Sequence, residues 1–95
     1  MAGLSCGEMS LLAWQILSTC VDQVVTLTDD KVAAAMKLFA DGAMADFPIE
    51  AGECAVPGVL ALMAGQAMEH SRVVVIGCEG ASDIDVYKAM LNSVA

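Results

Sequence analysis

The segment at residues 72–76, Arg-Val-Val-Val-Ile, constrains the fold more than any other part of the chain. Its β-branched residues favour a strand, and a strand that is apolar on both faces is typical of the middle of a parallel sheet. A second such run, Gln-Val-Val-Thr-Leu, lies at residues 23–27. Helical patterns separate the two runs, and parallel strands joined by helices form right-handed crossovers, so we predict an α/β fold.

Four segments have the apolar spacing of helices: residues 10–20, 28–42, 54–69 and 82–92. Ser10, Thr28 and either Ser82 or Asp83 are candidate N-caps, and Pro57 is tolerated in a first turn. The 10–20 and 54–69 helices have so few polar positions that we expect both to be largely buried.

The predicted element order is α-β-α-α-β-α within a single small domain, residues 1–95. Two parallel strands form only a partial sheet, because a sheet usually needs three or more strands to be stable by itself. We therefore expect a second copy of the chain, or the rest of a larger protein, to complete the sheet.

The composition also favours self-association. Hydrophobic residues make up 58% of the chain and aromatic residues only 4%, with a mean hydropathy of +0.69. A domain of 95 residues cannot hide that much apolar surface easily. We expect a homo-oligomer, most simply a dimer.

The charge balance excludes several classes of partner. The formal net charge is −8 and the pI is about 4.1. Such a chain repels polyphosphate backbones and anionic lipid headgroups, so we expect neither nucleic acid nor a membrane surface as a partner. No apolar stretch reaches the roughly 18–20 uncharged residues that a membrane span needs.

The four cysteines, Cys6, Cys20, Cys54 and Cys78, are widely and irregularly spaced. An even number would permit disulfides, but no signal peptide precedes them, and most lie beside apolar runs. We therefore expect reduced cysteines in a cytoplasmic protein. There is no Cys-x-x-Cys pair, and the single His70 has no neighbouring ligands, so we predict no metal site.

Two segments carry the pattern of a possible binding site. Residues 74–82 read as a buried strand followed by a glycine-flanked turn and a helix start, a place where open α/β sheets bind ligands and anions. Many such turns bind nothing. Glu53 begins an otherwise apolar helix, and a first-turn glutamate can also serve the helix dipole alone.

Together with the opening Met-Ala-Gly-Leu-Ser-Cys-Gly-Glu at 1–8 and the Trp14 helix, these segments carry a family resemblance. Ala-Gly-Glu at 51–53 and Ser-Arg-Val-Val-Val-Ile-Gly-Cys-Glu-Gly at 71–80, with Asp83 beyond, complete it. The chain resembles the C-terminal region of the diaminopropionate ammonia-lyases. These are fold-type-II pyridoxal-phosphate (PLP) enzymes, related to serine/threonine dehydratases and threonine synthases, and they catalyse α,β-elimination of an amino acid to a keto acid and ammonia.

The resemblance implies where a cofactor would lie. Cys78 falls where the family places a neutral partner for the pyridine nitrogen of PLP, between Gly77 and Gly80 in the turn. Glu53 matches an acidic residue near the cofactor ring. Gly3, Gly7 and Glu8 match a loop at the active-site mouth.

The departures from the family pattern matter more. Nothing here matches its Schiff-base lysine or its glycine-rich phosphate loop, and Lys31, Lys37 and Lys88 read as surface charges. Met1 falls where the longer family chain runs straight through, so we expect a truncated lyase-like domain. We predict no catalytic residue, no activity for the isolated chain and no PLP bound by this chain alone. The alternatives are one subunit of a split lyase, whose N-terminal half is a separate chain, and a binding module that takes a small anion or metabolite at residues 77–82.

Overall fold

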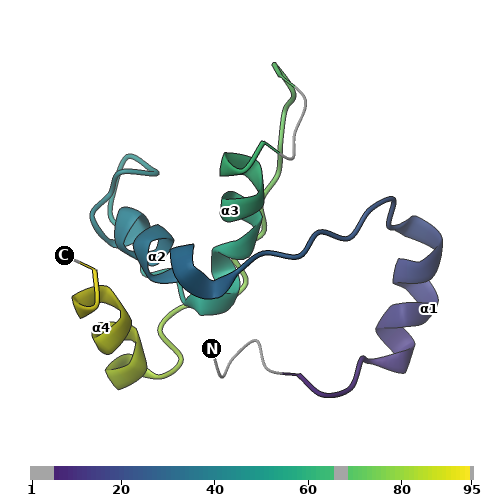
Figure 1. Cartoon of the computed structure of the whole chain (residues 1–95), viewed down its shortest axis with the longest axis horizontal. Helices are drawn as coiled ribbons and strands as arrows, with labels where there is room; N and C mark the ends of the chain where they lie inside the picture. Colours follow the sequence, from purple (N-terminus) through teal and green to yellow (C-terminus); the bar gives the residue numbers. More distant parts are fainter. Residues whose placement is uncertain (1–5, 66–68, 95) are drawn as a thin grey trace.

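The computed structural model describes residues 6–65 and 69–94, and its elements are helices (Figure 1). In chain order they are α1 (Leu11–Cys20), η2 (Asp29–Lys31), α2 (Val32–Ala40), η3 (Glu53–Ala55), α3 (Pro57–Met63) and α4 (Ile84–Asn92). Helices α2, α3 and α4 gather into one body, and α1 stands apart from them at the end of an extended segment. Within the described ranges, no helix is both long and apolar enough to cross a lipid bilayer.

The predicted α/β fold is wrong for the described part of the chain, which contains no strand. Residues 23–27 and 72–76 run as extended chain without pairing in a ladder. Val24 is 80% exposed and Val74 is 90% exposed. β-Branched residues favour extended backbone locally, but a strand exists only where its N–H and C=O groups pair with a neighbour. The order α-β-α-α-β-α and the partial parallel sheet therefore do not describe this structure.

The starts of α1 and α4 follow the sequence closely. Ser10 caps α1, because its Oγ accepts the Ala13 N–H at 3.2 Å. Of the two candidates for the last helix, Asp83 is the cap, with Oδ1 accepting the N–H groups of Asp85 and Val86 at 3.1 and 3.2 Å. Each cap replaces a hydrogen bond that the first helical turn lacks.

The middle helices are shorter than predicted. The Thr28 hydroxyl contacts the Asp30 carboxylate and makes no capping bond, and a 3-10 turn precedes α2. Gly42, with φ of 77°, follows the end of α2, and Gly65, with φ of 84°, follows α3, both in the left-handed region that favours glycine. Part of the predicted 54–69 helix, residues 66–68, lies outside the described residues.

A small core lies where α2 meets η3 and α3. Its buried residues are Val32, Ala35, Met36, Ala51, Ala55, Val56 and Val59. Tyr87, Met90 and Leu91 of α4 pack against it from one side. The expected burial of two whole helices is wrong: α1 buries no residue, and on α3 Met63 is 63% exposed.

Candidate functional site

Two loops far apart in the sequence meet beside the core, and together they form what we call the loop junction, residues 50–54 and 77–81. The Gly52 N–H donates to the Glu79 carbonyl oxygen at 2.9 Å. The Cys54 N–H donates to Glu79 Oε1 at 3.4 Å, and the Ala81 N–H donates to Glu50 Oε1 at 3.0 Å. Carboxylates of the chain itself therefore hold the two loops together.

The loop junction requires a glycine at position 52. A Cβ atom there would overlap the Gly80 carbonyl oxygen and Glu79 Oε1, and would lie 3.0 Å from Glu79 Cδ. A backbone carbonyl cannot rotate away as a side-chain tip can, so only a residue without a side chain lets the loops come this close.

Two cavities flank the loop junction. The smaller, about 150 Å³, lies between it and α4, and its lining includes Glu53, Gly80 and Tyr87. The larger, about 660 Å³, is lined in part by Gly77, Cys78, Gly80 and Val59. Both are open to the surface, so either could admit part of a small molecule.

The structure brings the four sequence-predicted site residues to this junction. Glu53 begins η3, and Gly77, Cys78 and Gly80 lie on the loop that crosses it. The Cys78 thiol donates to the Cys54 carbonyl oxygen at 3.7 Å.

The loop predicted to form the active-site mouth lies elsewhere. Gly7 and Glu8 are exposed on the segment that leads into α1, which stands apart from the other helices (Figure 1). Gly3 lies outside the described residues. The mouth loop and the loop junction therefore do not form one site here.

The sequence analysis missed the two residues that hold the junction, Glu50 and Glu79. Each lies beside a residue that was singled out, Glu50 two positions before Gly52 and Glu79 directly after Cys78. An acidic residue next to each glycine-bearing turn was the available signal. The hydrogen bonds of these two carboxylates to backbone N–H groups 25 and 31 residues away could not be predicted from the sequence.

The carboxylates change the chemistry of their neighbours. Burial, followed by the hydrogen bond and the negative charge of Glu79, raises the pKa of the Cys54 thiol to about 11. Burial also raises the pKa of Tyr87, with a contribution from the negative charge of Glu50. Cys54 is therefore a protonated, weakly nucleophilic thiol at neutral pH.

The loop junction does not fit PLP as a whole. Its cavities are lined by Glu50, Glu53 and Glu79, and among the described residues no lysine or arginine lines either one. The N–H groups of Gly52, Cys54 and Ala81 already donate to acceptors of the chain. A phosphate group needs free N–H donors or cations, so this half-pocket repels it.

The basic residues lie elsewhere. Lys31 and Lys88 are exposed, and Lys37 Nζ pairs with Asp41 Oδ2 at 3.4 Å along α2. Within the described residues, no group of three or more acidic, histidine or cysteine side chains could hold a metal ion.

Comparison with known proteins gives one consistent relationship. Over 104 aligned residues the chain is 34% identical to an enzyme of Escherichia coli K12, and the same identity holds for the enzymes of the O6:H1 and O157:H7 strains. The chain is similar to diaminopropionate ammonia-lyase. This agrees with the resemblance found in the sequence.

The match is unequal in length. It covers 96% of this chain but only 26% of the lyase, so the chain spans about a quarter of the length of these relatives. No family model matches the chain. No solved structure matches it either.

Proposed function

We propose that this chain is a lyase-like domain, equivalent to the C-terminal part of a fold-type-II PLP ammonia-lyase, and that it is catalytically silent by itself. The observation that carries the proposal is the acidic lining of the loop junction, where Glu50, Glu53 and Glu79 line the two cavities and no described lysine or arginine does. The similarity to a quarter of diaminopropionate ammonia-lyase supports the same origin.

The chemistry of elimination explains the expected silence. An enzyme of this kind needs an amine placed to hold the aldehyde of PLP and a cradle for its phosphate. Lys31 and Lys88 are exposed and line neither cavity of the loop junction. By the family resemblance, Cys78 and Glu53 would belong to the wall that faces the cofactor ring, and Cys78 would be the neutral partner of the pyridine nitrogen.

The same half-pocket suits one other function, a subunit of a split lyase. A separate chain would then supply the lysine and the phosphate loop, and Cys78 would contact the pyridine ring. The third candidate, a module that binds a small anion at residues 77–82, is disfavoured because the Ala81 N–H already donates to Glu50. We also propose that the chain associates with itself, and that it acts in the cytoplasm with its thiols reduced.

The decisive experiment is a turnover assay on the purified chain. PLP and diaminopropionate are added, and ammonia release is followed together with visible absorbance. We expect no ammonia above a PLP-only blank and no saturable absorbance change. A variant with Lys31, Lys37 and Lys88 replaced by Gln controls for unspecific reaction of exposed amines with the aldehyde.

Two outcomes would change the proposal. Steady ammonia release by the chain alone would refute it. Release that begins only after a second chain, equivalent to the remaining three quarters of the lyase, is added would favour the split enzyme. In that case Cys78→Ala should lower the rate, and Cys20→Ala, on the distant helix α1, should not.

A further inference from the structure

Helix α1 carries an apolar surface that no other described part of the chain covers. Its sequence, Leu-Leu-Ala-Trp-Gln-Ile-Leu-Ser-Thr-Cys, contains no charged residue, and none of its residues is buried. Leu11 is 80% exposed, Leu12 is 73% exposed and Ile16 is 61% exposed. A helix that is apolar around most of its circumference is stable in water only when other protein atoms cover it.

The accessible surface area of the chain shows how much surface a partner would have to bury. It measures 7215 Å², whereas a compact monomer of 9.8 kDa exposes about 5,200 Å². The excess is roughly 2,000 Å² per chain. Two chains that each bury this excess would form an interface of roughly 4,000 Å², within the range of obligate homodimers.

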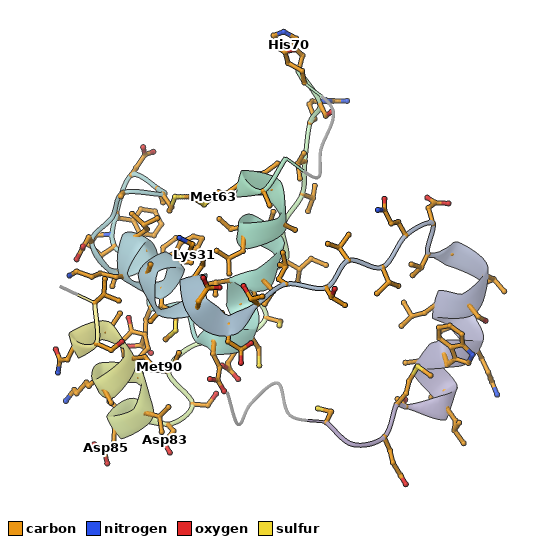
Figure 2. The ribbon with its side chains drawn as sticks, in the orientation of Figure 1. Lys31, Met63, His70, Asp83, Asp85 and Met90 are labelled. Atoms are coloured by element: carbon orange, nitrogen blue, oxygen red, sulfur yellow. The ribbon has the colours of Figure 1, made fainter. Side chains whose placement is uncertain are left out.

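A groove of matching character lies between α2 and α3. Its volume is about 410 Å³, and its wall is formed by Ala34, Ala35, Leu38, Leu60, Met63 and Ala64. Lys31 lies at one edge, and Figure 2 shows it on the side of the helices where Met63 projects from α3. The three alanines leave room for the close approach of another helix.

Charge selects this groove over the other faces of the molecule. The chain carries a net charge of −8, so two copies repel one another wherever carboxylates meet. Neither α1 nor the groove contains an acidic residue, and the charged residue at the groove is the basic Lys31. Contact between α1 of one copy and the groove of another therefore brings no carboxylates of the two surfaces together, and charge repulsion opposes it least.

The connection between the two surfaces allows exchange between copies. Residues 21–28 run extended from α1 to the groove edge, where Leu27 and Thr28 form part of the lining. Eight extended residues reach roughly 26 Å, enough to place α1 on a neighbouring molecule. In a twofold pair, each copy can offer its helix to the groove of the other.

We propose that this chain forms an arm-exchanged homodimer in which α1 of each copy packs into the α2–α3 groove of its partner. The proposal goes beyond the lyase-like function, because the contact uses neither the loop junction nor a cofactor. The exchanged dimer covers the exposed apolar surface of α1 and leaves both flanking cavities of the loop junction open.

The single tryptophan, Trp14, makes the arrangement measurable. It lies on α1 and is 47% exposed in the isolated chain. Sedimentation at micromolar concentration should give twice the mass of 9.8 kDa, and the emission of Trp14 should shift to shorter wavelength in the dimer and return on dilution.

Two variants attack the contact from its two sides. Ala34→Glu places a carboxylate in the groove, and Leu12→Asp places one on α1, which makes no contribution to the core. Because a charge buried without a partner strongly opposes association, each should weaken the dimer by about 100-fold or more. Ala89→Glu, on the exposed face of α4, is the matched control and should remain dimeric.

Several results would overturn the proposal. One is a wild-type chain that stays monomeric at about 100 micromolar, because an obligate dimer is fully associated at such a concentration. Others are a dimer that Leu12→Asp does not weaken, and a dimer in which Trp14 emits as an exposed indole. A monomer with a buried Trp14 would mean that α1 folds back onto its own groove. None of these results would affect the ammonia-release assay, so the exchanged dimer and the catalytically silent lyase-like domain fail separately.

Discussion

Replacing Gly52 with alanine tests the loop junction directly. The added Cβ would overlap the Gly80 carbonyl oxygen and a Glu79 carboxylate oxygen. Because both belong to the facing loop, that loop must move away from η3. The Gly52 N–H bond to the Glu79 carbonyl, 2.9 Å long, and the Cys54 N–H bond to Glu79 Oε1, 3.4 Å long, would then be lost or lengthened.

The size of the effect follows from these contacts. Two lost hydrogen bonds cost about 2 kcal/mol in net stability, and forcing a carbon atom into occupied space costs about 1–3 kcal/mol more. Alanine also restricts the unfolded chain, which returns up to about 1 kcal/mol. We expect Gly52→Ala to lower the free energy of unfolding by about 3 kcal/mol.

Urea denaturation followed by circular dichroism measures this difference, and Gly77→Ala is the matched control. Gly77 lies on the same loop as Glu79 and Gly80. A Cβ atom at Gly77 would meet no other atom within 4 Å, and the backbone of Gly77 is not left-handed. Its replacement should change stability by less than about 1 kcal/mol. Equal midpoints for the two variants would refute the packing described for the loop junction.

Two further predictions concern single side chains. At pH 8, a pKa of about 11 leaves about 100-fold less thiolate on Cys54 than the ordinary value of 9.0 would. The greater nucleophilicity of the more basic thiolate offsets part of this, so iodoacetamide should modify Cys54 about tenfold more slowly than an ordinary thiol, with a rate that rises up to about pH 11. Mass spectrometry of the Cys54 peptide reads this rate, and a midpoint near 9 would contradict it. Asp83→Ala should destabilise the chain by about 1 kcal/mol in urea melts through loss of the α4 cap, whereas Asp83→Asn should retain most of the stability; equal losses would argue against capping.

The N-caps of α1 and α4 were the part of the fold that local chemistry could predict. Ser10 and Asp83 cap their helices with oxygen atoms that reach N–H groups two or three residues away, and Pro57 begins α3 for an equally local reason. Thr28 was the exception, because its hydroxyl has a nearer partner in Asp30. The two glycine-bearing motifs of the candidate site were also recognisable from residue types alone.

The burial of the helices could not be predicted in the same way. The pattern of α1 is that of a core helix, yet no other part of the described chain covers it. A run of apolar residues indicates that a surface is to be buried against other protein atoms. It does not indicate whether those atoms belong to the same chain or to another one.

By itself, the sequence determined the starts of α1 and α4, the acidic composition and the similarity to a lyase, because each depends on residue identity or on contacts a few positions apart. The tertiary structure decided that residues 23–27 and 72–76 remain unpaired and that Glu50 and Glu79 hold the loop junction. Strand pairing and carboxylate contacts across 25 to 31 residues depend on which distant segments meet, and the free energy of packing sets that choice.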